Sequence, residues 1–171
     1  MADLDHWLKG VLVEETSSVT RQAVVFEVPP EIHTTELRPD GLLHVVSTDT
    51  LHTLPPPWSL LRQEAVFEGK MPGDKLGPDA LQRACFRREA RQAQRFAEAA
   101  KGKRELDASP EHCAAWVLAP HVPQWLPAWE QGGRLALVPA GEGCWWVRPA
   151  MFPVLWIAAN ELPLRDELIP F

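Results

Sequence analysis

The feature that most constrains the fold is a nine-residue stretch, Arg62 to Lys70, whose apolar centre at residues 65–67 is bounded on both sides by turn-forming residues. This pattern predicts a β-strand. Side chains alternate between the two faces of a strand, so Glu68 and Lys70 share one face at its end. A carboxylate in this position can hold a divalent cation while the lysine orients an attacking water. Gly69, which lies between them, allows its carbonyl to approach the same ion.

The Glu-x-Lys pair also has a simpler explanation. Mixed charges on a solvent-exposed strand face are common, and exposed ion pairs contribute little to stability. The pair predicts a site only if other parts of the chain supply matching groups.

The bulk composition predicts a single globular domain. The chain has 171 residues, of which 46% are hydrophobic and 23% are charged. No apolar run approaches the ~18 residues that a membrane span needs, and the acidic N-terminus does not resemble a secretory signal. The three cysteines are widely separated and suggest reduced thiols. We therefore expect a cytoplasmic protein without a membrane partner. The apolar ending, residues 168–171, suggests either that the natural protein continues or that the terminus is buried.

Positive charge is concentrated in one segment, Arg83 to Arg104. This segment contains eight basic and two acidic residues, a charge of +6, so the rest of the chain carries −12 within the net charge of −6. Such a separation predicts a local surface for a polyanion on an acidic body.

The order of elements follows from turn signals and apolar runs. A hairpin is predicted at Arg38-Pro39-Asp40-Gly41, since Pro and then Asp-Gly favour a tight turn. Its arms are residues 33–38 and 42–47. We expect further strands at 23–28 (alternatively a helix end), 113–118 and 154–158. A second hairpin is expected from 134–138 with 144–148. Helices are expected at 3–12 and at the C-terminal residues 164–171. Residues 120–127 contain three prolines and are expected to be irregular.

A long helix is predicted from Asp79 to about Ala100, with Gly102 ending it. At 100° per residue its small and aromatic side chains form one apolar stripe of Phe86, Ala90, Ala93, Phe96, Ala97 and Ala100. Gln82 lies on that stripe. Four arginines lie on the opposite side, and they form either a nucleic-acid-binding face or a solvated helix face: Arg87, Arg88, Arg91 and Arg95.

Taken together, Pro39-Asp40 on a hairpin, Glu68-Gly69-Lys70 at a strand end and a basic helix after it resemble the PD-(D/E)XK nuclease superfamily. The resemblance covers residues 36–118. More loosely, the proline- and tryptophan-containing loop before the strand is similar to bacterial nucleases of the recombination-promoting, transposase-associated type. The resemblance implies an α/β fold of the restriction-endonuclease type, with a mixed central β-sheet flanked by helices in a single domain of residues 1–171. The core would be 36–118, and 119–171 a strand-rich C-terminal part.

The resemblance also implies roles for individual residues. Asp40 and Glu68 would bind Mg²⁺ (or Mn²⁺) together with the Gly69 carbonyl, and Lys70 would activate the water. Gln82 would correspond to a glutamine that many family members place on the next helix. A glutamate of the first helix would be Glu14 or Glu15, and the sequence does not choose between them. Pro39-Asp40 is equally well explained as a tight turn, and Gln82 as a cap of local backbone.

Two functions are consistent with these features. The first is a nuclease that hydrolyses DNA phosphodiester bonds, with metal-bound water as the nucleophile and the arginine face holding the DNA backbone. The second is a non-catalytic module on the same scaffold that binds nucleic acid or a protein, with the C-terminal third as its contact surface. A preference for DNA over RNA is not determined, and a homodimer is left open.

Overall fold

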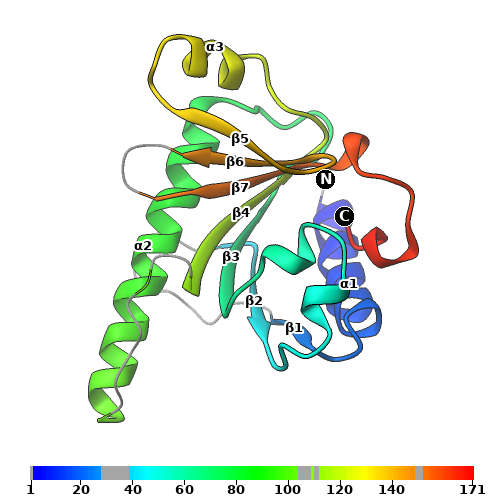
Figure 1. Ribbon diagram of the computed structural model, residues 1–171, viewed down its shortest axis with the longest axis vertical. Helices are drawn as coiled ribbons and strands as arrows, with labels where there is room; N and C mark the ends of the chain where they lie inside the picture. The colour runs from blue at the N-terminus through cyan, green and yellow to red at the C-terminus, as the bar shows by residue number, and fades with distance from the viewer. Residues whose placement is uncertain (1, 28–38, 104–108, 110–111, 149–151) are drawn as a thin grey trace.

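A computed structural model describes residues 2–27, 39–103, 109, 112–148 and 152–171, with the side chains of residues 2–9 excepted. Its centre is a seven-stranded mixed sheet, and Figure 1 shows α1 on one side of the sheet and the long α2 on the other. The expected α/β architecture, a mixed sheet flanked by helices in a single domain, is confirmed. The helices and strands of the described residues are α1 (Ala2–Val19), β1 (Val24–Glu27), β2 (Gly41–Val45), β3 (Glu64–Gly69), α2 (Pro78–Lys101), β4 (Cys113–Ala119), α3 (Trp125–Gln131), β5 (Ala136–Gly141), β6 (Cys144–Arg148) and β7 (Val154–Ala158).

The strand order is β1-β2-β3-β4-β7-β6-β5. The first three strands are antiparallel to one another, β3, β4 and β7 are mutually parallel, and β6 and β5 close the sheet in antiparallel pairing. Parallel neighbours need a long connection, and α2 supplies it between β3 and β4. The C-terminal part of the chain therefore extends the same sheet.

Each face of the sheet has its own core. Ala65 and Phe67 of β3 point to the core covered by α1, which contributes Leu12. Val66 points to the α2 side, in a small cluster with Leu42. Further along the sheet, a second large core joins β4, β6 and β7 to α2 and α3. Glu64 and Glu68 share the face of Val66, because side chains alternate along the strand.

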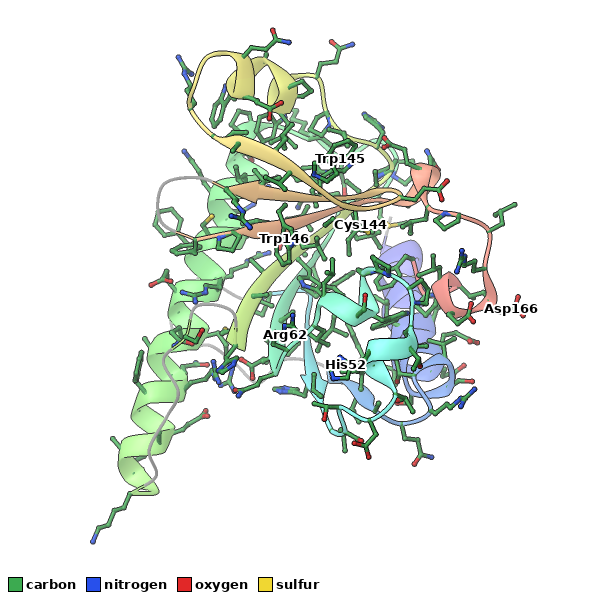
Figure 2. The ribbon with its side chains drawn as sticks, viewed as in Figure 1. His52, Arg62, Cys144, Trp145, Trp146 and Asp166 are labelled. Carbon is green, nitrogen blue, oxygen red and sulfur yellow. The ribbon has the colours of Figure 1, made fainter. Side chains whose placement is uncertain are left out.

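Most tryptophans of the described residues lie in or against these cores. Trp58, Trp116 and Trp156 are fully buried, and Trp58 packs against Phe171 at the end of the chain. Trp145 and Trp146 are neighbours in β6 and pack against the two opposite cores (Figure 2). The described tryptophans are therefore mainly core residues and not an exposed stacking surface.

Most expected elements are present. The strands at 23–28, 42–47, 62–70, 113–118 and 154–158, the hairpin of β5 with β6 and the long helix α2 are confirmed within a few residues. The helix expected at 3–12 is present but continues to Val19. The first arm of the predicted hairpin, 33–38, lies outside the described residues. Two expectations are wrong: α3 forms despite Pro127, and the C-terminal segment has only a 3-10 turn at Asp166–Leu168. Pro127 is tolerated because it lies in the first turn of α3, where a backbone N–H has no partner within the helix, and Leu126 packs in the core.

The orientation of α2 is opposite to the expected one. Phe86 and Phe96 of the apolar stripe are 63% and 46% exposed, whereas Arg88, Arg91 and Arg95 are at most 8% exposed. The arginine face lies against the sheet because the strand beneath it carries buried carboxylates and other hydrogen-bonding groups. None of the helices in the described part of the chain combines the length and apolar character needed to cross a membrane.

Candidate functional site

The face of β3 beneath α2 carries two buried carboxylates, each contacted by an arginine of the helix. Glu64 is 5% exposed and Glu68 is 2% exposed. Charges so deeply buried require partners, because desolvation strongly disfavours an unpaired ion. The carboxylates stand four residues apart on the strand, and their arginine partners, Arg91 and Arg87, stand four residues apart on the helix.

Glu68 has a different cation at each oxygen. Lys70 Nζ lies 2.7 Å from its Oε1, so the two ends of the Glu-x-Lys motif meet as the strand geometry predicted. The guanidinium of Arg87 contacts Oε2. Arg83, half-exposed, lies 4.0 Å from Oε1 and makes a closer ion pair with Asp79 at 2.8 Å.

Asp40 lies next to this group. Its backbone N–H donates to the carbonyl of Phe67 at 3.1 Å, although Phe67 pairs with the next residue, Gly41, in the β2–β3 register. Two residues on the β2 side thus face one residue of β3, which is the pattern of a β-bulge. The Gly69 N–H also donates to Asp40 Oδ2 at 2.9 Å. The structure therefore brings Asp40, Glu68, Gly69 and Lys70 together, and we call this group with Arg87 the β3-end cluster.

The β3-end cluster supplies donors that suit Mg²⁺. Asp40 and Glu68 provide hard carboxylate oxygens. Within a strand the N–H and C=O of one residue point toward the same neighbour, so the Gly69 carbonyl faces the side of Asp40. Glu68 Oε2 is buried and is contacted by Arg87, as Oε1 is contacted by Lys70. Across the described residues no three His, Cys, Asp or Glu side chains group to hold a metal, so a site would need the carbonyl as well.

Glu64 forms a second, fully hydrogen-bonded cluster. Arg91 donates to both of its oxygens, from Nε at 2.8 Å and Nη2 at 2.9 Å, and His44 Nδ1 lies 3.1 Å from Oε2. Burial acts to raise the pKa of Glu64, but the hydrogen bonds and charges of His44 and Arg91 outweigh it and lower the pKa to about 2. This planar, bidentate pairing is typical of a structural ion pair.

The expected nucleic-acid-binding face of α2 is therefore not available as a surface. Arg88 Nε donates to the Cys113 carbonyl at 2.7 Å, and Arg95 donates to Gln63 at 2.9 Å. Arg91 is bound to Glu64, and Arg87 to Glu68. Both alternatives weighed from the sequence, a DNA-binding face and a solvated face, are wrong, because these arginines pair with groups beneath the helix.

Two further candidates lie apart from the β3-end cluster. Gln82 is exposed on the outer side of α2 with Phe86, so it does not reach the carboxylates as expected. Glu14 is exposed and Glu15 is half-buried on α1, which packs on the opposite face of the sheet. Neither glutamate has a described contact with Glu68, and the choice between them no longer bears on the site.

The sequence analysis missed the role of Arg87 as a partner of Glu68. A signal was present: Glu64 and Glu68 share one face of an otherwise apolar strand, and carboxylates on a buried face require cationic partners. Interpreting the arginine face of the next helix as exposed concealed these partners.

No protein-family model, curated protein or solved structure matches this chain. The fold and the cluster define a mixed α/β domain with a buried acidic and basic group at the end of β3. Its function is inferred from these residues.

Proposed function

We propose that the chain is a metal-dependent nuclease that hydrolyses phosphodiester bonds of DNA in the cytoplasm. The observation that carries the proposal is the hydrogen bond from the Gly69 N–H to Asp40, which fixes a second carboxylate beside the Glu68–Lys70 pair. Two carboxylates, a carbonyl and a lysine at one strand end are the groups that the PD-(D/E)XK resemblance requires. Their residue types and the printed contacts Gly69–Asp40 and Lys70–Glu68 support the proposal.

The residues of the β3-end cluster would have separate roles in the reaction. Asp40, Glu68 and the Gly69 carbonyl would hold Mg²⁺ (or Mn²⁺), which when bound supplies a Lewis acid and a water nucleophile at neutral pH. Lys70, 13% exposed, has an ammonium that can donate to the attacking water or to a phosphate oxygen. Its ion pair with Glu68 keeps it oriented toward the site.

The phosphate backbone would be held by cations that remain accessible. Arg83 is 42% exposed beside the β3-end cluster, and Lys101 and Lys103 are exposed at the end of α2. These groups are fewer than the sequence suggested. We therefore expect weak, salt-sensitive DNA binding with a small slope of log K against log salt.

Cleavage of plasmid DNA in Mg²⁺ or Mn²⁺ tests the proposal. Glu68→Gln removes the charge that would hold the ion, and Lys70→Ala removes the ammonium while leaving both carboxylates. Each should reduce the rate on the order of 10²–10³-fold. Calorimetry should separate them, since Lys70→Ala still binds Mn²⁺ and Glu68→Gln binds it poorly. Glu142→Gln, an exposed carboxylate in the β5–β6 turn, is the matched control and should leave cleavage unchanged.

Two results would argue against the proposal. Cleavage that survives both Glu68→Gln and Lys70→Ala would place the chemistry elsewhere or in a contaminant. A wild-type chain with no activity in any metal and no Mn²⁺ binding would favour the alternative function, a non-catalytic module that binds nucleic acid or a protein.

A further inference from the structure

The outer side of α2 carries a regular line of exposed side chains. Its inner side packs against β3, β4 and β7 (Figure 1). On the outer side, exposed residues recur at alternating steps of four and three along the helix. We call this line the outer seam of α2, and it consists of Gln82, Phe86, Glu89, Ala93, Phe96 and Ala100. Alternating steps of three and four are the spacing with which one helix packs along another.

The outer seam is apolar where it is bulky. Phe86 is 63% exposed and Phe96 is 46% exposed. Small residues lie between them, namely Ala93 in the seam and Ala90 beside it, and a second helix can approach closely over small side chains. The seam therefore has two aromatic projections that flank a low centre.

This shape is complementary to a second copy of itself. In an antiparallel pair of α2 helices about a two-fold axis, every contact between two different residues occurs twice. When Phe86 of one copy faces Phe96 of the other, the same register places Glu89 opposite Ala93. Two Phe–Phe layers then enclose a centre rich in alanine, and aromatic pairs of this kind are favourable beyond the area that they bury.

The charges along the helix favour the same register. It brings Asp79, in the first turn of α2, to Lys103 of the other copy, just past the helix end, and both residues are exposed. Parallel pairing would instead set Glu89 against Glu89 and Asp79 against Asp79. In the antiparallel pair Glu89 faces a small residue and is already paired with Arg88 of its own helix, so the contact includes no unpaired charge at this position.

The area of the contact sets its strength. The outer seam spans 19 positions, residues 82–100, which at 1.5 Å per residue is about 27 Å of helix. The exposed parts of its two phenylalanines would together bury on the order of 200 Å² on each copy. Even with the alanines, this is less than the ~800 Å² per partner of a standard stable interface. A dimer held by this seam should therefore be weak, with a Kd on the order of 10–100 µM.

We propose that the outer seam of α2 is a contact surface between two copies of this chain, which form a weak two-fold dimer through an antiparallel pair of α2 helices. The inference does not depend on the proposed nuclease activity, because the seam lies on the side of α2 that faces away from Glu68 and Lys70.

Sedimentation equilibrium of the full chain, between about 5 and 500 µM, tests this inference. Phe96→Glu places a charge in the aromatic layers and should raise the Kd at least ~30-fold, as the loss of a central contact does. Leu164→Glu adds the same charge at a fully exposed apolar side chain away from α2 and should change the Kd less than about threefold. Thermal unfolding of each variant checks that it is folded.

Charge reversal tests the antiparallel register. Asp79→Lys and Lys103→Glu should each raise the Kd about three- to tenfold, since like charges then meet at both ends of the dimer. An equimolar mixture of these two variants should dimerise as tightly as wild type, because opposite charges again meet at both ends. Both positions are exposed, so this test remains valid even if Phe96→Glu does not fold.

Several results would overturn the inference. A wild-type chain that stays monomeric at ~500 µM has no such contact, and a fall in Tm for Phe96→Glu would then indicate that another segment of the chain covers the seam. A dimer that Phe96→Glu leaves intact uses a different surface. Equal weakening by Leu164→Glu would reflect general charge repulsion. Charge-reversal variants that dimerise as tightly as wild type would refute the antiparallel pairing.

Discussion

The buried Glu64–Arg91 pair should make the stability of the fold depend on pH in a defined window. The pKa of Glu64 is lowered from its usual 4.5 to about 2. Each unit corresponds to ~1.36 kcal/mol, so the charged carboxylate contributes about 3 kcal/mol to stability. Because the folded-state pKa is depressed, this contribution is fully present above pH 4.5 and is lost as the pH falls toward 2.

The substitution Glu64→Gln isolates this effect, because it keeps the shape of the side chain and removes its charge. At pH 7 we expect urea unfolding to show the variant about 3 kcal/mol less stable than wild type. The value agrees with the ~3–5 kcal/mol lost when a buried ion pair loses one partner. As the pH falls from 4.5 to 3, wild type should lose about 2 kcal/mol more than the variant. Other groups titrate in both chains, so their effects cancel in the difference.

One result of this comparison would refute the prediction for the Glu64–Arg91 pair. If the two unfolding free energies fall in parallel between pH 4.5 and 3, Glu64 is not charged and paired in the folded state. The account of α2 as a helix held by buried arginines would then fail. A Glu142→Gln variant measured over the same pH range should follow wild type throughout, since Glu142 is exposed in a turn.

Three further results are expected. Gly41→Ala would place a Cβ 2.2 Å from the ring of Phe26 and should lower the unfolding free energy by about 1–3 kcal/mol. Gly10→Ala in α1 meets nothing within 4 Å and should raise the unfolding free energy by up to ~1 kcal/mol. Equal Tm values for the two variants would contradict this. Trp58→Ala should cost about 3–5 kcal/mol in urea unfolding because it empties a fully buried site, and a loss below about 1 kcal/mol would refute that packing. Burial raises the pKa of all three thiols, to about 11 for Cys85 and Cys113 and about 12 for Cys144. A disulfide reagent at pH 8 should therefore label them quickly only in urea. Fast labelling of the folded chain would contradict their burial.

Local patterns were sufficient to predict most of the sheet. Alternation and turn chemistry identified the strand ending at Glu68-Gly69-Lys70, and the side-chain period of two correctly placed Glu68 and Lys70 on one face. The position of Asp40 depended on a strand pairing that no local pattern encodes. The turn signal at Pro39-Asp40 marked the residue, and its hydrogen bonds with Phe67 and Gly69 bring it to the end of β3.

The orientation of α2 could not be predicted from its own residues. Hydrophobicity favoured burying the face of Phe86 and Phe96, and that rule fails when the opposing surface is charged. Buried carboxylates at Glu64 and Glu68 make the arginine face the complementary one. The charge count of the segment was correct, but its interpretation as a binding surface required knowing what lay beneath the helix.

The two halves of α2 are attached to the sheet by forces that respond oppositely to temperature. Leu81 and Ala84 anchor the first half in an apolar core, whereas Arg88, Arg91 and Arg95 bind the second half through polar contacts. Apolar contacts weaken on cooling, and the desolvation penalty of ion pairs falls on heating. Amide hydrogen exchange along α2 should therefore depend on conditions, the first half opening more readily near 0 °C and the second half in acid, which protonates Glu64. Exchange along one helix would then report both the cold-induced and the acid-induced opening of the fold.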